Sequence, residues 1–196
     1  IGLCAEEQLG SDDNTISNSI KLLSNLMQTN FSTQNPLTTL KVEIKHLLMY
    51  YRLQRELYGD MISVEVKIPR ELNGYVIPKI TLQPILENAV QYGIKPSGRA
   101  CTVTVAGELT ADKLDIYVLD DGIGIEENAL NSLRERMNRE DLAQDSHIGL
   151  CNINQRIKLI FGQEYGIAIE SSFGSETRVR ITLPAKKMED ILGEDR

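Results

Sequence analysis

The sequence has 196 residues, enough for one ordinary domain or for one domain with an appendage, and its 41% hydrophobic and 25% charged residues are typical of a soluble globular protein. The formal net charge of −7 argues against broad binding to nucleic acids or anionic membranes, although it leaves room for a local basic pocket that takes a phosphate ligand. Cys4, Cys101 and Cys151 lack CxxC spacing and indicate reduced thiols in a cytosolic setting, and no apolar run approaches the roughly 20 residues of a membrane-spanning helix.

The first third of the chain is expected to be helical. It starts with IGLCAEEQLG, without an initiator methionine or a signal peptide, so we expect a fragment of a longer protein. Between residues 14 and 28 the apolar residues recur at close to helical spacing, and Pro36 then stops the pattern. A second helix is predicted from Leu40 to Tyr58. Its apolar stripe consists of Leu40, Ile44, Leu47, Leu48 and Tyr51.

After Gly59 the pattern alternates between strands and helices. The predicted elements are a half-buried strand (63–68), a helix (82–94), a hairpin (102–122, with its turn near 110–113), a mostly polar helix (127–145), a helix ending at Gly162 (148–162) and a final hairpin (166–184, with its turn at 173–175). Residues 185–196 form a charged tail that we expect to be frayed. Strands paired through hairpins, with helices on one face, indicate an α+β two-layer sandwich.

The helix predicted at LQPILENAVQYGI carries polar residues at its centre. The stripe that would pack on the sheet consists of Leu82, Ile85, Leu86, Ala89, Val90 and Gly93. The other side carries Glu87, Asn88, Gln91 and Tyr92. Asn88 and Tyr92 are one turn apart, as are Glu87 and Gln91. Taken alone, this polar side is either the solvated face of an amphipathic helix or a functional site.

The stretch VLDDGIGI takes an apolar strand directly into an aspartate and glycine loop. Its glycines allow the backbone to approach a ligand closely, and Asp120 at the strand end can accept a hydrogen bond from a ligand amino group. The alternative is a turn closed by an aspartate side chain. The stretch is not a GxGxxG fingerprint and lacks the GK[ST] of a P-loop, so neither of those nucleotide-binding motifs applies.

Two later glycine motifs are weak signals when taken separately. HIGLCNINQRI places Gly149 at the start of a helix, where free backbone N–H groups can bind an anion, or where the helix simply begins after a loop. In SSFGSETRVRITLP a glycine turn precedes Thr177 at the base of the last strand. By itself this second motif indicates only a hairpin.

The order and spacing of these motifs resemble sensor histidine kinases of the LytS/YesM type, whose ATP-binding domain belongs to the superfamily shared with gyrase and mismatch-repair ATPases. In that type the motifs are close to LQPLVENAIKHGI, DxGxG, IGLxNIxxRL and GxGT. Here they read LQPILENAVQYGI, DDGIG, HIGLCNINQRI and FGSETRV, within a resemblance that covers roughly residues 40–184. The resemblance implies the Bergerat-type ATP-binding fold, a mixed, largely antiparallel sheet with helices on one face, preceded here by two helices.

The resemblance also implies a role for each motif in binding ATP and Mg²⁺. Asn88 would ligate the Mg²⁺ that bridges the ATP phosphates, and Glu87 would orient or deprotonate the nucleophile. Asp120 would bind the adenine amino group. The other implied nucleotide-binding residues are Gln91, Tyr92, Gly122, Gly124, Ile125, His147, Ile148, Gly149, Leu150 and Thr177. Residues 125–148 would form a mobile ATP lid.

Three features depart from the family pattern. Gln91 stands where Lys or Arg is common, which removes one charge partner for a phosphate, and Glu176 stands where the last motif usually has glycine. The phosphoacceptor motif, similar to NPHFLxN, is missing. Of the two histidines, we interpret His46 as a structural residue of the second helix, whereas His147 either contacts the phosphate end or is solvated in a loop.

The resemblance divides the chain into a helical remainder of a dimerisation and connector region (1–59), an ATP-binding catalytic domain (60–186) and a charged tail (187–196). It implies a cytoplasmic kinase core that transfers the γ-phosphoryl of ATP to a histidine outside this chain, for relay to a response regulator. The parent protein would be a homodimer anchored upstream in a bacterial membrane, with no nucleic-acid partner. The alternatives are an ATP-gated interaction module without phosphotransfer and a gyrase-like ATPase in which Glu87 activates water.

Overall fold

The computed structural model describes residues 35–94, 98–138 and 148–194, so the first predicted helix, at 14–28, lies outside the described residues. The helices are α2 (Leu40–Tyr58), α3 (Leu82–Asn88), α4 (Glu127–Asn138), α5 (Ile148–Phe161) and α6 (Met188–Glu194), with 3-10 turns at Gly59–Met61 and Arg70–Gly74 and a π-helical turn at Ala89–Ile94. The strands are β1 (Leu37–Thr39), β2 (Ile62–Lys67), β3 (Val76–Pro78), β4 (Cys101–Thr110), β5 (Lys113–Asp120), β6 (Gly166–Ser172) and β7 (Glu176–Pro184). In the described ranges, no helix combines the length and the apolar character needed to span a membrane.

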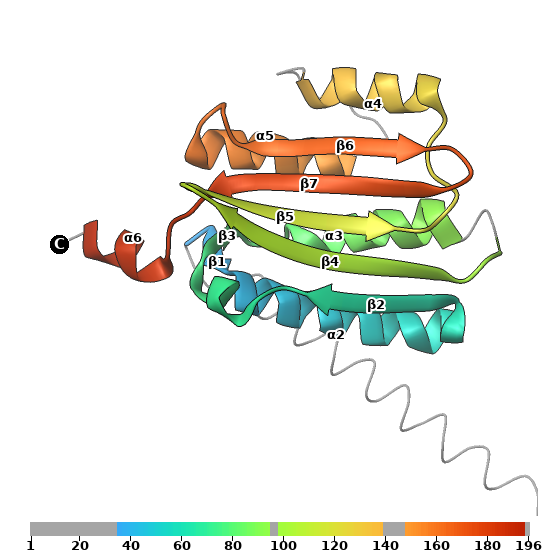
Figure 1. Cartoon of the computed structure of the whole chain (residues 1–196), viewed down its shortest axis with the longest axis horizontal. Coiled ribbons are helices and arrows are strands. Elements are labelled where there is room, and N and C mark those ends of the chain that lie inside the picture. The colour runs from blue at the N-terminus through green and yellow to red at the C-terminus, as the bar shows by residue number, and fades with distance from the viewer. Residues whose placement is uncertain (1–34, 95–97, 139–147, 195–196) are drawn as a thin grey trace, which may run out of the picture.

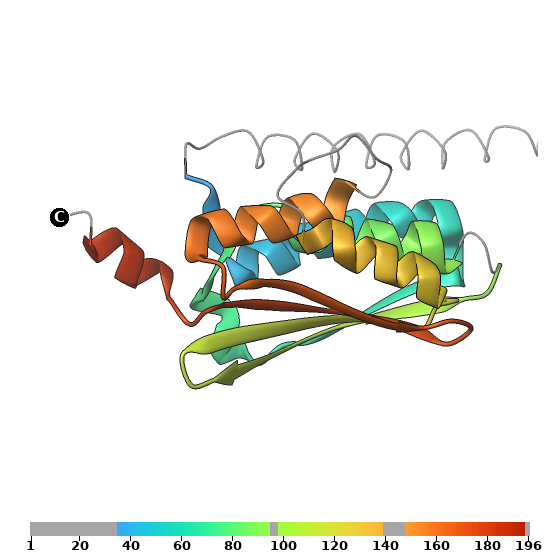
Figure 2. The ribbon, with the colours of Figure 1, turned by 90° about the horizontal axis from the view of Figure 1, so that it is seen from above.

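A five-stranded sheet in the order β2-β4-β5-β7-β6 forms one layer of the molecule (Figure 1). Strands β2 and β4 run parallel, and the other neighbours run antiparallel. Helices α2, α3, α4 and α5 lie together on one face of this sheet, as the turned view in Figure 2 shows. These observations confirm the predicted α+β two-layer sandwich with a mixed, largely antiparallel sheet.

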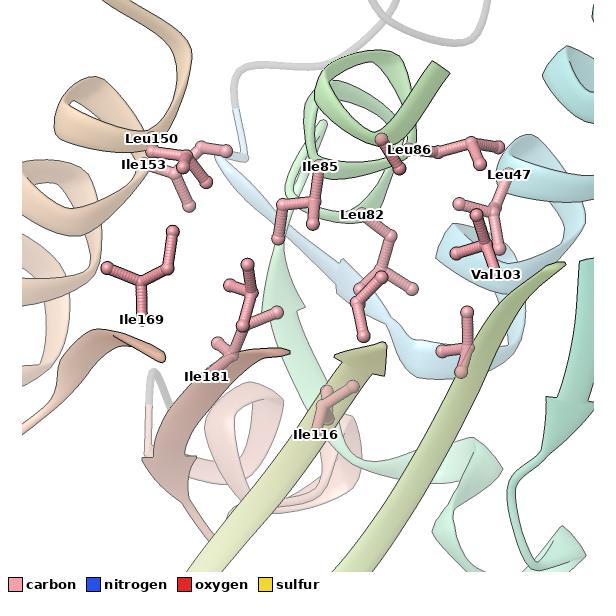
Figure 3. Packing of buried hydrophobic residues seen from close by; sticks show 14 of the residues in the cluster. Leu47, Leu82, Ile85, Leu86, Val103, Ile116, Leu150, Ile153, Ile169 and Ile181 are labelled. Atoms are coloured by element: carbon pink, nitrogen blue, oxygen red, sulfur yellow. The ribbon is translucent and has the colours of Figure 1, made fainter. Parts of the chain in front are cut away.

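The hydrophobic core fills the space between the sheet and the helices. Alternate residues of β5, such as Ile116, face the helix layer, and Leu82, Ile85 and Leu86 of α3 meet them from above with at most 2% of their surface exposed (Figure 3). Burial of these apolar side chains away from water is the main contribution to the stability of the fold. The whole apolar stripe predicted for this helix is buried, which confirms the face on which it packs.

The first turn of α3 is held by a buried carboxylate from α2. The two carboxylate oxygens of Glu43, which is 2% exposed, accept hydrogen bonds from the backbone N–H groups of Ile80 at 2.9 Å, Thr81 at 3.0 Å and Leu82 at 3.3 Å. These donors would otherwise be unsatisfied at a helix start. From α5, Arg156 Nη2 donates to the carbonyl of Ile80 at 2.8 Å. Helices α2, α3 and α5 are therefore linked at the N-terminal end of α3.

Three parts of the fold differ from the predicted elements. The helix predicted over 82–94 widens into a π-helical turn at Ala89–Ile94, and the antiparallel pair of β1 and β3 was not predicted. The prediction of a frayed tail was wrong for residues 188–194, which form α6. That helix begins where Lys187 N–H donates to Asp190 Oδ2 at 2.9 Å, and the preceding Lys186 carbonyl accepts a hydrogen bond from Val76 N–H at 2.9 Å. Side-chain capping and this backbone contact together hold the tail against the body of the domain.

Candidate functional site

A cavity of about 430 Å³ lies between the C-terminal end of α3, the start of α5 and the neighbouring ends of β5 and β7. The predicted site residues that line it are Asn88, Tyr92, Asp120, Gly124, Ile125, Leu150 and Thr177. They come from four motifs that are far apart in the sequence. The volume is typical of a pocket for a small molecule.

One wall of the cavity is built around Asp120, the last residue of β5. Asp120 pairs in register with Thr177 of β7, so the acid and the hydroxyl lie side by side on adjacent strands. The Gly122 N–H donates to Asp120 Oδ1 at 3.1 Å. Burial raises the pKa of Asp120 to about 6, against the lowering effect of the Gly122 hydrogen bond, and the charges of Asp121 and Glu176 raise it further. Asp120 is thus a half-buried acceptor facing the pocket.

The glycines of the DDGIG loop are required by close backbone contacts. A Cβ atom added at Gly122 would lie 2.7 Å from Gly93 Cα and 2.8 Å from Asp120 Oδ1. Gly124 has a φ of +67°, and a Cβ there would overlap with the carbonyl oxygen of Ser172. The loop therefore packs on the π-helical turn on one side and on the β6–β7 hairpin on the other, at distances that no other residue permits.

Hydrogen bonds fix the loop to the end of that hairpin. Gly174 N–H donates to the Ile123 carbonyl at 2.6 Å, and Ile125 N–H donates to Ser171 Oγ at 2.9 Å. Ser171 Oγ in turn lies 3.0 Å from Thr177 Oγ1. The loop after β5 and the turn between β6 and β7 consequently form one connected unit around the pocket.

Asn88 of α3 and Tyr92 of the π-helical turn that follows form the opposite wall. Asn88 ends the α-helical part, and the π-helical turn that follows is a geometry often found at functional sites. Gln91 Nε2 donates to the Tyr92 hydroxyl at 3.4 Å, and Gln83 Nε2 donates to Glu87 Oε1 at 2.9 Å. Asn88 and Tyr92 line the cavity, whereas Glu87 and Gln91 are not among its lining residues.

The described part of the chain contains no cluster of three or more His, Cys, Asp or Glu side chains placed to hold a metal ion. Mg²⁺ does not need such a cluster when it binds with a nucleotide, because phosphate oxygens and water supply most of its ligands. The side-chain oxygen of Asn88, on the cavity wall, is a donor of the kind that Mg²⁺ accepts. The residues present therefore fit Mg²⁺ bound together with a phosphate ligand.

The remaining predicted site residues have different positions. Gly149 is half-buried in the first turn of α5, where an added Cβ would lie 3.7 Å from Pro84 Cβ, and it does not line the cavity. Ile148 begins α5, and His147 lies outside the described residues. His46 is buried in α2, and this burial lowers its pKa from the usual 6.5 although the Glu43 charge opposes the shift. A neutral histidine within the helix layer agrees with its interpretation as structural.

Most of the lining residues that sequence reasoning missed have no polar side chain, and Glu126 is the exception. The missed set is Ile85, Ala89, Gly93, Val118, Ile123, Glu126, Ala129, Leu133, Ile169, Phe173 and Val179. Ile85 and Ala89 were assigned to the packing stripe of the helix predicted over 82–94. Their spacing from Asn88 was the available signal, since one turn of helix separates Ile85 from Asn88.

The sequence comparisons point to one family. Residues 78–187 match the family model described as "Histidine kinase-, DNA gyrase B-, and HSP90-like ATPase". Sensor histidine kinase YesM of Bacillus subtilis is 31% identical over 171 residues, which make up 87% of this chain and 28% of YesM. Sensor protein LytS of Oceanobacillus iheyensis is 29% identical over 171 residues, which make up 87% of this chain and 29% of LytS. The chain thus spans just over a quarter of the length of these curated relatives.

A solved structure gives the same picture of the fold. The histidine kinase domain of a blue-light activated histidine kinase from Erythrobacter litoralis superimposes with a TM-score of 0.54 at 17% sequence identity, covering 92% of this chain and 79% of that chain. At this level of identity the likeness concerns the arrangement of the sheet and helices.

Proposed function

The chain belongs to the histidine kinase-, DNA gyrase B- and HSP90-like ATPase family, as a domain of the LytS/YesM type, and on that premise we propose that it is the kinase core of a two-component sensor. In this proposal it binds ATP with Mg²⁺ and transfers the γ-phosphoryl group to a histidine outside this chain. The observation that carries the proposal is that Asn88, Asp120 and Thr177 line a single cavity.

The wall formed by β5 and β7 would hold the adenine. The half-buried Asp120 carboxylate accepts hydrogen bonds and is suited to the exocyclic amino group of the base, with Thr177 beside it. Gly122 packs directly on Gly93, which lines the cavity, so this contact holds the loop after β5 against the π-helical turn. Apolar lining residues such as Val118 and Ile169 would exclude water from the ring.

The wall formed by α3 would hold the phosphates. Asn88 would bind Mg²⁺, which supplies neutralisation of phosphate charge when bound. Gln91, Tyr92 and the first turn of α5 with Ile148, Gly149 and Leu150 are the further contacts proposed for this end, and His147 would be their neighbour. Backbone N–H groups in the first turn of a helix favour an anion, which supports placing the phosphates at the start of α5.

Glu87 would act on the incoming histidine. It precedes Asn88 directly, and its Oε1 is held by Gln83 Nε2 at 2.9 Å, outside the lining of the cavity. A group that orients or deprotonates a nucleophile arriving from elsewhere needs such a place beside the pocket, because the nucleophile must approach the γ-phosphoryl in line.

The proposed partners follow from this reaction. The acceptor histidine would belong to a dimerisation segment of the same protein, and a response regulator would take the phosphoryl group from it. The parent protein would be a homodimer anchored in a bacterial membrane, with this domain in the cytoplasm.

Calorimetry with ATP and ADP, with and without Mg²⁺, tests nucleotide binding. We expect Mg²⁺-dependent binding, and no binding at millimolar nucleotide would contradict the proposal.

Phosphotransfer is tested by supplying the histidine-containing segment of the parent protein in trans. Glu87→Gln should reduce the transfer rate more than it weakens ATP binding, as expected for a group that acts in the transition state. Glu164→Gln, an exposed change in the loop after α5, is the matched control.

An ATP-gated interaction module is the second candidate. It is favoured by the uncharged Gln91 in the π-helical turn after α3, where the family commonly has Lys or Arg. In that case the chain would bind nucleotide but would not transfer phosphoryl to the supplied histidine segment. Steady phosphate release without an acceptor would instead indicate a gyrase-like ATPase.

A further inference from the structure

Phe173 is an exposed aromatic side chain at the edge of the cavity. It is 64% exposed and follows β6 in the turn that leads to β7. Within the described ranges, the other large hydrophobic residues exposed to solvent are Leu57, Val66, Leu109 and Leu159, and none of these lines the cavity, whereas Phe173 does. Exposing an aromatic ring forgoes the free energy that its burial would contribute, so its location needs a reason.

The backbone that carries Phe173 is held firmly in place. The next residue, Gly174, donates its N–H to the Ile123 carbonyl at 2.6 Å. On the other side, Gly124 lies so close that an added Cβ would be 3.1 Å from Phe173 Cα. Phe173 is consequently fixed to the same loop that begins with Asp120.

The register of the strands gives the distance from the acid to the ring. Asp120 of β5 pairs with Thr177 of β7, and Thr177 pairs with Ser171 of β6. Two strand spacings of about 4.8 Å separate Asp120 from Ser171, and Phe173 lies about 7 Å further along the chain, so the Cα atoms of Asp120 and Phe173 are about 12 Å apart. Both residues line the same cavity, so a purine held at Asp120 by its amino group lies between them, within reach of the Phe173 side chain.

We propose that Phe173 stacks on the base of the bound nucleotide and covers the open side of the adenine pocket. This inference rests on the proposed function, because it assumes that adenine binds at Asp120. An aromatic face pairs with any planar base, whereas the Asp120 acceptor selects one that carries an amino group. Phe173 therefore contributes affinity for the base, and Asp120 contributes the choice between bases.

A single tryptophan provides a direct probe. The chain contains no tryptophan, so Phe173→Trp places the only indole at the proposed contact. Saturation with ADP should change the intensity of its fluorescence. Leu159→Trp is the matched control, because Leu159 is 86% exposed on α5 and does not line the cavity, and its fluorescence should not respond. An indole at residue 173 that fails to respond to saturating ADP would overturn the proposal.

Affinity measurements complete the test. Phe173→Ala should weaken adenosine, ADP and ATP by the same factor, roughly 5- to 100-fold, because the lost stacking involves only the base. The urea midpoint should change little, since the side chain is mostly exposed. Equal affinities for Phe173→Ala and the wild-type chain would refute stacking while leaving the nucleotide site in place. No nucleotide binding by the wild-type chain would refute both.

Discussion

Replacing Asp120 by asparagine should weaken nucleotide binding and at the same time stabilise the ligand-free protein. Asparagine keeps an oxygen that can accept the hydrogen bond from Gly122 N–H, now 3.1 Å from Asp120 Oδ1, but it has no charge. One charge-assisted hydrogen bond to the adenine amino group is lost, and such a bond contributes roughly 1.5–3 kcal/mol, which corresponds to about one to two decades in Kd.

The gain in stability follows from the pKa of Asp120. Burial raises this pKa from 3.8 to about 6, so the folded state favours the neutral carboxyl and ionisation opposes folding. The stability of the wild-type protein therefore falls as pH rises from about 4 to about 6, by at most about 3 kcal/mol. Because Asp120 is partly exposed, solvent reduces this penalty, and we expect Asp120→Asn to add about 1–2 kcal/mol at pH 8.

Urea unfolding at pH 5 and pH 8 measures the stability, and calorimetry with ADP measures the affinity. The stability gain should be smaller at pH 5, where the wild-type carboxyl is largely neutral. Wild-type affinity for ADP should fall below pH 6 as the acceptor is protonated, and the variant should lack this step. Asp112→Asn, an exposed change in the β4–β5 turn, is the control. An unchanged Kd would show that Asp120 is only a turn residue, and a gain independent of pH would refute the linkage argument.

Three further predictions concern the support of the site and its limits. Glu43→Ala should lower the free energy of unfolding by about 3 kcal/mol or more in urea, because three buried N–H groups lose their acceptor, and a change below about 1 kcal/mol would contradict this role. Gly122→Ala should weaken ADP binding, because the new Cβ would lie 2.7 Å from Gly93 Cα. Gly74→Ala is the control, since a Cβ there would meet nothing within 4 Å, and it should bind ADP like the wild-type chain. An ADP affinity of Gly122→Ala equal to that of the wild-type chain would refute the steric argument. The chain alone should incorporate no acid-labile phosphate label from ATP. Stoichiometric label that is lost in either His46→Ala or His147→Ala would show that the acceptor lies within the chain.

The sequence predicted most elements because the local signals were strong. Helix α2 has the predicted bounds, and both hairpins have their turns where glycine, aspartate and lysine residues interrupt the alternating pattern. The same reasoning could not find the β1–β3 pair, because its strands are three residues each and their pairing depends on contacts across 37 or more residues. Short strands of this kind are specified by tertiary packing and not by local preference.

The lining of the cavity was likewise predicted only in part. Polar residues such as Asn88 and Asp120 interrupt apolar patterns, so they stand out in the sequence. Phe173 and Ile85 do not stand out, because an apolar residue that lines a pocket follows the same spacing as one in the core. The spacing of apolar residues also gave no sign of the π-helical turn at Ala89–Ile94, whose Gly93 packs against Gly122 of the distant loop after β5.

The distribution of stabilising and destabilising features supports a functional interpretation of the cavity. Away from the cavity, the buried carboxylates of Glu43 and Asp115 accept hydrogen bonds from nearby donors. Burial tends to raise the pKa of Asp115, but hydrogen bonds from Arg180 and Thr182 outweigh it and lower the pKa, so this carboxylate favours folding. At the cavity the balance is reversed, because the Asp120 carboxylate has no basic partner among the contacts that shift its pKa, and Phe173 leaves its ring in water. Features that cost stability and gather around one pocket are expected where a ligand supplies the missing contacts.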